Sequence, residues 1–511
     1  MKKLYITTAI DYANGDPHIG HIYEKILADT VARVMRVQGH DVQFMTGLDE
    51  HGQKVSQSAK KNGISEKEQC DKIAENFKHA CDVFDISYDR YIRTTDEDHV
   101  TVVQKCLQKL FDDGEIYKKS YTGLYSKTAE RFVLEKDKVD GKWPTDFGEV
   151  VELSETNYFF KLAKHREWLI DYINTHPDFI FPKFRTKQLL EFLSEPINDL
   201  CISRPKNRLS WGIELPFDSE YVTYVWFDAL LNYVTGANFL TEQFNEYWPA
   251  DIHVIGKDIL VPAHSVYWPI MLHALGLEMP KKFLVHGWWL VFGEKMSKSI
   301  GNVIDPLNLA SKFGADPVRY HLMREMTVGQ DCDFSAKRFI ARYNSDLAND
   351  LGNLVNRLLN MANRYCSGMI SEVTVNEQQE QALKKLIGDS IDEIVEHCNN
   401  FAFNQALDKL FSCISSINVY IENRAPWKLS KSENPKDHKI VKSSLSLSVE
   451  CLCVLIKLLY PIMPSTSKKI LNLFGSDEDI KWDADLSNFS RLAGKKLSEK
   501  AILFPKFDID A

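Results

Sequence analysis

Apolar residues with the spacing of strands and apolar residues with the spacing of a helix alternate along the first fifty positions. Residues 4–9 are rich in β-forming side chains, and the turn sequence Asn14-Gly15-Asp16-Pro17 follows them. From Ile19 the apolar positions have a helical spacing, and Gly39 is well placed to end that helix. Residues 41–45 are β-rich again. The order strand, helix, strand predicts a parallel sheet.

The pattern changes twice further along the chain. Residues 117–207 are polar and rich in turn-forming residues, which predicts an inserted domain. Short β-rich runs at 221–227, 253–255 and 283–286 then predict that the sheet resumes, and from about Ala336 the pattern is helical. The predicted fold is an α/β, Rossmann-type parallel sheet split by a connective insertion and followed by an all-α domain. The predicted boundaries are 1–116, 117–214, 215–290, 291–336 and 337–511.

Length and composition describe an ordinary globular protein. The 511 residues are too many for one core and predict roughly two to four domains of ~100–200 residues each. No apolar run reaches the ~18 residues of a membrane span, and no signal peptide is visible. With a formal net charge of −9, a nucleic-acid partner would need local basic patches. The ten cysteines form no C-x-x-C motif, so we expect buried free thiols, a reducing compartment and a cytoplasmic location; an organellar setting fits the same sequence.

A first candidate site is the segment His18-Ile19-Gly20-His21, between the first predicted strand and its helix. Open α/β sheets bind ligands at this position, and the N–H groups of a helix start favour anions. Gly20 lets a nucleotide approach the backbone, and the imidazoles supply donors. A chance pair of histidines at a helix start is the alternative.

A second candidate site is the loop Lys295-Met296-Ser297-Lys298-Ser299, which glycines flank on both sides. Two lysines three residues apart can close on a triphosphate. The alternative is a solvated charged loop. Both segments occur in the order expected at the two ends of one parallel-sheet domain, and the combination is more specific than either alone.

These two segments are the HIGH and KMSKS signatures of class I aminoacyl-tRNA synthetases. The chain resembles the methionyl-tRNA synthetase family over nearly its whole length, in the form without zinc-knuckle cysteines. The matches include residues 13–15, 47–52, 203–204, 211–213, 224–229, 256–259 and 286–295. The resemblance implies ATP-dependent activation of L-methionine to methionyl-adenylate and transfer to the 3′-terminal ribose of tRNA(Met), for initiation and elongation. ATP would arrive with Mg²⁺, and residues 337–511 would bind the anticodon.

The resemblance also implies roles for individual residues. His18, His21, Lys295 and Lys298 would be catalytic, and they would bind ATP together with Gly20, Met296, Ser297 and Ser299. The methionine site would consist of Ala9, Ile10, Tyr12, Asp49, Trp226, Ala229, Tyr233, Ile259 and His264. Asp49 could instead cap a turn, and Trp226 and Tyr233 could be ordinary core residues. Two departures from the family pattern lie here: one extra residue precedes His264, and Asp11 stands where many relatives have proline.

Other expectations concern metal, anticodon and assembly. The chain has no cysteine between Cys106 and Cys201, so we expect no structural zinc in the insertion. The resemblance assigns Asn353, Arg357 and Trp427 to the anticodon; a helix-end packing anchor is the alternative for Trp427. The short sequence after residue 506 leaves no room for an appended tRNA-binding domain, so a monomer is expected.

Three rival functions make distinguishable predictions. Synthetases for leucine, isoleucine or valine need several hundred more residues for editing, and a cysteine enzyme would want thiolate zinc ligands. A HIGH-containing ligase without tRNA would not need about 170 helical residues at its end. A non-catalytic tRNA-binding paralogue does not explain why both signatures are intact.

Overall fold

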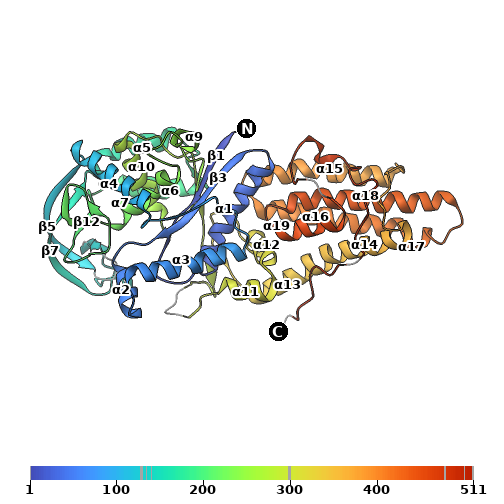
Figure 1. Cartoon of the computed structure of the whole chain (residues 1–511), viewed down its shortest axis with the longest axis horizontal. Helices are drawn as coiled ribbons and strands as arrows, with labels where there is room; N and C mark the ends of the chain where they lie inside the picture. The colour runs from blue at the N-terminus through green and yellow to red at the C-terminus, as the bar shows by residue number, and fades with distance from the viewer. Residues whose placement is uncertain are drawn as a thin grey trace.

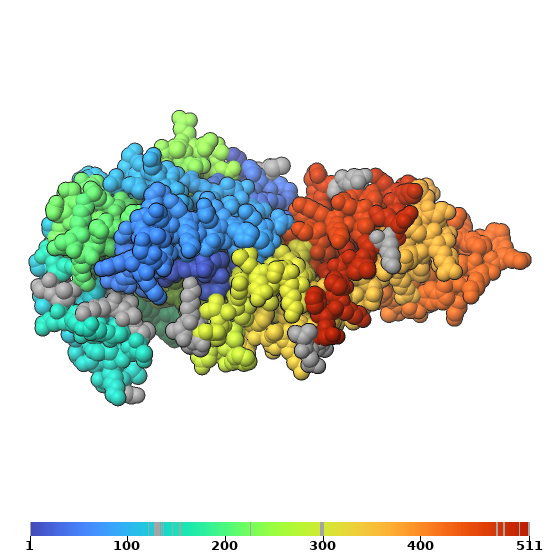
Figure 2. All heavy atoms as spheres, turned by 60° about the horizontal axis from the view of Figure 1, so that its bottom comes forward, coloured from blue at the N-terminus to red at the C-terminus, as the bar shows by residue number. Residues whose placement is uncertain are grey.

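The protein has two parts arranged along its long axis, an α/β half and a helical half (Figure 1). The computed structural model describes residues 2–126, 131–133, 135–139, 141–296, 301–476, 479–499 and 501–508. Figure 2 shows the segment around residues 300–340, in yellow, between the blue N-terminal part and the orange and red helical part. The predicted order of a split sheet domain followed by a helical domain is therefore confirmed.

The central sheet is parallel, with strand order β2-β3-β1-β13-β14-β8 and β4 beside β3. Its strands are β1 (Lys3–Thr8), β2 (Asp11–Tyr12), β3 (Asp41–Asp49), β4 (Arg90–Arg93), β8 (Ile180–Phe181), β13 (Ile252–Gly256) and β14 (Phe283–His286). From β1 the chain passes through α1 (Ile19–Val37) to β3 on one side, while β13 pairs with β1 on the other. The strand order thus reverses at β1, and open α/β sheets bind ligands at such a point.

The connective insertion has a separate antiparallel sheet of order β6-β5-β7-β9. Its two long strands, β5 (Ile116–Ser126) and β7 (Val150–Phe160), pair along their whole lengths, and β6 (Arg131–Val133) and β9 (Leu200–Cys201) lie outside them. The insertion then returns to the parallel sheet through α5 (Arg166–Thr175), β8 and α6 (Phe184–Ser194).

The strand prediction for residues 221–227 is wrong in two respects. Strand β12 (Asp218–Thr223) belongs to a small antiparallel sheet with β10 (Ser203–Pro205) and β11 (Glu214–Leu215), and the next residues form helices α7 (Val225–Leu230) and α8 (Asn232–Gly236). Phe227, Leu230, Leu231 and Val234 are all buried. Their spacing of three and four places them on one helical face, and packing of that face against the core decides the structure. The strands predicted at 253–255 and 283–286 are confirmed.

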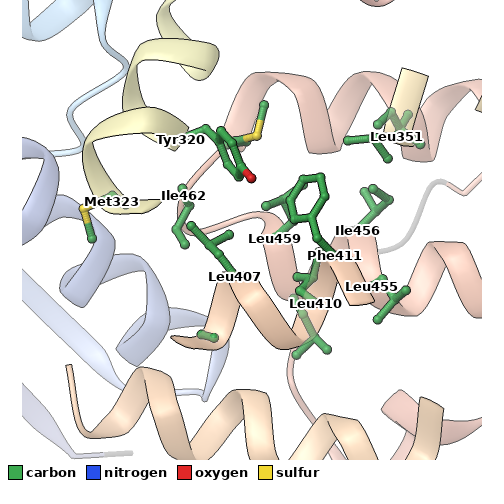
Figure 3. Close-up of a cluster of buried hydrophobic side chains, with 14 of the residues drawn as sticks. Tyr320, Met323, Leu351, Leu407, Leu410, Phe411, Leu455, Ile456, Leu459 and Ile462 are labelled. Atoms are coloured by element: carbon green, nitrogen blue, oxygen red, sulfur yellow. The ribbon is translucent and has the colours of Figure 1, made fainter. Parts of the chain in front are cut away.

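The helical half is a bundle of α14 (Asn353–Cys366), α15 (Gln378–Asn399), α16 (Phe403–Arg424), α18 (Pro435–Leu459) and α19 (Pro464–Leu473). Figure 3 shows apolar side chains of the bundle, including Phe411 and Leu459, near Tyr320 of α12 (Ala315–Glu325). Met323 of the same helix belongs to the same cluster of buried residues. One cluster of buried apolar residues therefore continues from the sheet domain into the bundle.

Arg319 of α12 fixes the two halves to each other. Its fully buried guanidinium donates hydrogen bonds to Asp29 of α1 (2.6 Å), to the carbonyl of Phe84 (3.0 Å) and to the carbonyls of Pro461 and Ile462 in the bundle (3.0 and 2.8 Å). Because Asp29 lies on α1, the helix that His18 caps, this contact links the bundle directly to that helix.

Three further observations concern the cysteines, possible metal clusters and membrane spans. All ten cysteines lie in the described ranges and are free thiols, and Cys451 and Cys453 are buried in α18 as predicted. Within the described ranges, no group of three or more His, Cys, Asp or Glu side chains could hold a metal ion. Over the same residues, no helix combines the length and hydropathy of a membrane span.

Candidate active site

A cavity of about 670 Å³ opens where β1, β3, β13 and β14 end. Its lining includes every residue that we predicted for ATP or methionine and that the structure describes: Ala9, Ile10, Tyr12, His18, Gly20, His21, Asp49, Trp226, Ala229, Tyr233, Ile259, His264, Lys295 and Met296. Ser297, Lys298 and Ser299 lie outside the described residues. The tertiary structure thus brings together side chains that are up to 287 positions apart, from Ala9 to Met296.

His18 and His21 form the cap of α1. His18 Nδ1 accepts the Gly20 N–H at 3.0 Å, and His21 Nδ1 accepts the His18 N–H at 3.1 Å. The two rings stack with centroids 3.7 Å apart. Because each Nδ1 accepts, the proton of each neutral ring is on Nε2. The cap therefore provides two ring N–H donors at a helix N-terminus, where anions are favoured.

Gly20 and Ile19 fix the close contacts of the histidine turn with the His18 ring and with the backbone at Ile304. A Cβ on residue 20 would lie 2.9 Å from His18 Cε1, so only glycine leaves the capping ring in place. The N–H of Ile19, one of the donors that a helix leaves unpaired at its start, donates to the carbonyl of Ile304 at 3.1 Å. The chain that follows the lysine loop is thereby held against the histidine turn.

Lys295 lies at the rim of the cavity, on β16 (Glu294–Lys295). Its ammonium is 3.1 Å from Asp258 Oδ2 and 4.0 Å from the ring centroid of Trp288. Burial raises the pKa of Asp258, but the charge and hydrogen bond of Lys295 and a hydrogen bond from Trp288 together outweigh burial, so this pKa lies below its ordinary value. Asp258 is thus an ionised partner of a lysine that is itself exposed to solvent.

Asp49 is a buried carboxylate that pairs with no cation in the described part of the chain. It ends β3, and its Oδ1 has no hydrogen-bond partner among the residues that the structure describes. Burial, and next the negative charge of Asp228, raise the pKa of Asp49 well above its ordinary value. A buried carboxylate of this kind needs a positive group nearby to stay ionised. The cavity in front of Asp49 is where such a group can bind.

Asp228 lies behind Asp49 and has the opposite environment. Its carboxylate meets His51 Nδ1 at 2.7 Å and His99 Nε2 at 2.8 Å. Burial alone would raise the pKa of Asp228, but the two imidazoles lower it to about 2. Sequence reasoning did not assign this group, because His51, His99 and Asp228 come from three separate segments.

Tyr233 and His264 form a polar pair in the apolar part of the cavity. His264 Nδ1 donates to the carbonyl of Ile259 at 2.8 Å, so Nε2 accepts from the Tyr233 hydroxyl at 2.7 Å. Burial lowers the pKa of His264 to about 4, so the ring is neutral near neutral pH. The hydroxyl of Tyr233 is thereby fixed in orientation.

The extra residue before His264 has a local structural explanation. Residues Leu260–Tyr267 form a π-helical segment, interrupted by extended backbone at Val261, in which the His264 N–H donates to the carbonyl five residues earlier. A π-turn accommodates one more residue per turn than an α-helix. His264 consequently lines the cavity despite the longer sequence.

Four buried charged or ionisable side chains form a chain below the histidine turn. Lys25 pairs with Asp11 and Glu24, and Glu24 Oε2 is 3.0 Å from His286 Nε2. Burial alone would lower the pKa values of Lys25 and His286, but their carboxylate partners raise both. Glu24 was detectable from the sequence, because it lies three residues after His21 on one helical face. Asp11, the departure beside the cavity, balances the charge of Lys25.

The residues predicted for the anticodon lie in the helical half, away from this cavity (Figure 1). The Arg357 guanidinium of α14 stands 5.1 Å from the ring centroid of Trp427 on α17 (Pro426–Leu429), and it pairs with Glu422 at 2.6 Å. Asn353 is exposed one turn earlier on α14, and Trp427 is half-buried. The structure thus joins Arg357 and Trp427; what they bind stays a prediction.

Comparison with known proteins identifies the family. The family model described as tRNA synthetases class I (M) matches residues 4–147 and 146–359, and the anticodon-binding domain of tRNA ligases matches residues 380–502. A methionine–tRNA ligase of Clostridium acetobutylicum is 42% identical over 514 residues, which cover 100% of this chain and 79% of that protein. The chain belongs to the class I methionyl-tRNA synthetases.

Relatives and solved structures of methionyl-tRNA synthetases match over nearly the whole length. The Rickettsia conorii enzyme is 38% identical over 512 residues, with 99% of both chains covered. The structure of Mycobacterium tuberculosis methionyl-tRNA synthetase in complex with methionyl-adenylate superimposes with a TM-score of 0.91 at 37% identity, covering 99% of this chain and 100% of that one. The synthetase described here therefore has the family fold along its length, including the helical half.

Proposed function

We propose that the cavity binds L-methionine and ATP side by side and forms methionyl-adenylate with release of pyrophosphate. The methionyl group then passes to the 3′-terminal ribose of tRNA(Met), as membership of the family establishes for the overall reaction. In this reaction the methionine carboxylate attacks the α-phosphate of ATP. The protein therefore acts by positioning its substrates and stabilising charge, and it supplies no covalent nucleophile.

In this proposal Asp49 binds the methionine ammonium and the apolar walls hold the side chain. Asp49 supports this role because its carboxylate is buried and lacks a cationic partner in the described part of the chain. Tyr233 and His264 line the cavity together with Ala9, Ile10, Tyr12, Trp226, Ala229 and Ile259. An aromatic cavity with one oriented hydroxyl suits a polarizable thioether.

ATP, arriving as its Mg²⁺ complex, would occupy the part of the cavity between the helix cap and β16. The ring N–H groups of His18 and His21 would donate to phosphate oxygens, and Gly20 would let the nucleotide approach the backbone. Lys295 would leave Asp258 to stabilise the departing pyrophosphate, together with Lys298. Met296, Ser297 and Ser299 complete the proposed ATP site.

The helical half would recognise the anticodon through Asn353, Arg357 and Trp427. The Arg357 guanidinium lies over the Trp427 ring, and an unstacked anticodon base would stack on this pair. Stacking of a base on an aromatic ring contributes about 1–3 kcal/mol. We propose the division into 1–116, 117–214, 215–290, 291–336 and 337–511 as the catalytic halves, insertion, linking segment and anticodon-binding domain. A cytoplasmic monomer without structural zinc completes the proposal; sedimentation and elemental analysis test its last two parts.

The observation that carries the methionine proposal is Asp49, a buried carboxylate that lines the cavity and has no cationic partner in the described part of the chain. The test is ATP–pyrophosphate exchange with each of the twenty amino acids. We expect methionine to give the highest kcat/KM and leucine to be far behind, because apolar pockets discriminate by about 1–3 kcal/mol per methylene group. A preference for another amino acid would contradict the methionine assignment and leave only the class assignment.

Replacing Tyr233 by phenylalanine tests the polar end of the methionine site. The variant keeps the ring but leaves the buried His264 Nε2 without its donor. An unsatisfied buried acceptor costs about 1–3 kcal/mol, so in the free variant His264 should turn to find another donor. Methionine binding must then restore the orientation of the ring, and we expect KM for methionine to rise by up to about a hundredfold in exchange assays. KM for ATP should stay within about twofold of the wild-type value. An equal rise in both KM values would show that Tyr233 supports the whole cavity.

A further inference from the structure

The hairpin before the lysine loop has an unusual residue at its tip. Strand β15 (Trp289–Val291) pairs antiparallel with β16, with Val291 opposite Glu294, so Phe292 and Gly293 form a two-residue turn. Both have positive φ, 55° at Phe292 and 75° at Gly293. These angles belong to the type I′ turn, which matches the twist of the strands that it joins.

Phe292 suits neither the turn nor the core. The first position of a type I′ turn favours Asn, Asp or Gly, because a Cβ with a bulky side chain is strained at positive φ. Burial does not offset this strain, since Phe292 is 91% exposed, the highest exposed fraction among the large exposed hydrophobic residues of the described chain. A strained residue without a packing role points to a contact outside the chain.

The hairpin holds Phe292 rigidly beside the active site. The residues on both sides of the tip, Trp288 and Trp289 before it and Lys295 and Met296 after it, line the cavity. Leu290, two residues before Phe292, pairs with Lys295. The Gly293 N–H donates to Asp333 Oδ1 at 3.1 Å, and β15 also pairs with β17 (Cys332–Asp333). The phenyl ring therefore stands on a braced turn at the rim.

We propose that Phe292 is a stacking platform for an unpaired nucleotide of the tRNA 3′ end. During the transfer step the terminal ribose must reach the cavity, so the single-stranded nucleotides before it cross the rim. Every base has a π-face, and exposed aromatic side chains bind single strands by stacking. Stacking also needs no positive charge, which fits a chain of net charge −9. The inference rests on tRNA charging and extends it to a residue outside the substrate cavity.

Phe292→Asn tests the proposal because it separates the turn from the ring. Asparagine is favoured in the turn, so the melting temperature should stay the same or rise. Methionylation of tRNA(Met) should lose at least about fivefold in kcat/KM for tRNA, the equivalent of losing one stacked base. ATP–pyrophosphate exchange precedes tRNA and should stay within about twofold of the wild-type rate. Phe292→Tyr, which keeps a stacking ring, should charge tRNA normally.

A second measurement identifies the occupant. We would compare wild type and Phe292→Asn on tRNA(Met) transcripts that each carry one abasic site among the unpaired nucleotides before the terminal adenosine. At one position the two proteins should become equal, because that transcript has already lost the stacked base. Wild-type charging of Phe292→Asn with intact tRNA would overturn the proposal, and so would a parallel loss of exchange, which would place the ring on ATP. The activity of the unsubstituted protein in the exchange and charging assays tests the proposed function, independently of Phe292.

Discussion

Asp49→Asn is expected to reduce methionine-dependent ATP–pyrophosphate exchange by at least about a hundredfold. The substitution keeps the size of the side chain but removes the buried negative charge that the methionine ammonium would neutralise. Removing one partner of a buried ion pair costs about 3–5 kcal/mol, or roughly two to four powers of ten. Exchange kinetics at saturating ATP, with methionine varied, measure this loss as a fall in kcat/KM for methionine.

The thermal stability of Asp49→Asn should not fall with its exchange activity and should stay the same or rise. The pKa of Asp49 in the native state lies above its unfolded value, so the native state gains relative stability from this group at low pH and loses it as the pH rises through the native pKa. At neutral pH the charge therefore destabilises the ligand-free protein, and Asp49→Asn should melt at the same temperature as wild type or higher. Wild-type exchange activity in this variant would contradict the proposed role.

Asp228→Asn is the matched control, because it alters another buried aspartate whose charge acts on Asp49. Its native pKa of about 2 lies below the unfolded value, so its charge stabilises the native state above the unfolded pKa and less as the pH falls toward 2. The variant leaves His51 and His99 without their carboxylate and should lower the melting temperature at neutral pH. Opposite shifts of the melting temperature in the two variants would show that Asp49, unlike Asp228, has no cationic partner until a ligand binds.

Trp427→Ala is expected to reduce kcat/KM for tRNA methionylation by about ten- to a hundredfold while leaving exchange within about twofold of wild type. Losing one stacked base costs about 1–3 kcal/mol, and the adenylate forms in a cavity in the other half of the protein. Arg357 should show the same division, because its guanidinium stands over the Trp427 ring. Aminoacylation and exchange assays on one preparation measure both effects.

Leu429→Ala controls for packing. Trp427 and Leu429 lie on α17, and both are partly buried against the core of the bundle. If Trp427 is a packing anchor, Trp427→Ala should lower the melting temperature. It should then also reduce exchange and aminoacylation in parallel, because a loosened bundle supports the catalytic half less well. If Trp427→Ala behaves in this way and resembles Leu429→Ala, Trp427 is structural, and the anticodon contact must lie elsewhere on the bundle.

Local chemistry made much of the architecture readable from the sequence. The helix from Ile19 and its end at Gly39 follow from periodicity and backbone freedom, and residues 253–255 and 283–286 are strands as predicted. Residues 221–223 are a strand as predicted, in another sheet, but residues 225–227 were misread. Their β-branched and aromatic side chains are typical of strands, while the buried face of Phe227, Leu230 and Leu231 forms only when these residues pack as a helix. Short segments of this kind are decided by what they pack against.

The sequence by itself determined the two signatures, the order of the domains and the family that they indicate, because those features depend on residues that are close in the chain. Tertiary structure alone decided which groups carry unbalanced charge. Asp49 and Asp228 are both buried aspartates, yet one has a raised pKa and the other a lowered one, because the imidazoles of His51 and His99 contact the carboxylate of Asp228. The same holds for His264, which a π-turn brings to the cavity, and for Phe292, whose exposure and strain appear only in the folded hairpin. Electrostatic and steric environments depend on distances in space, and spacing along the chain does not determine those distances.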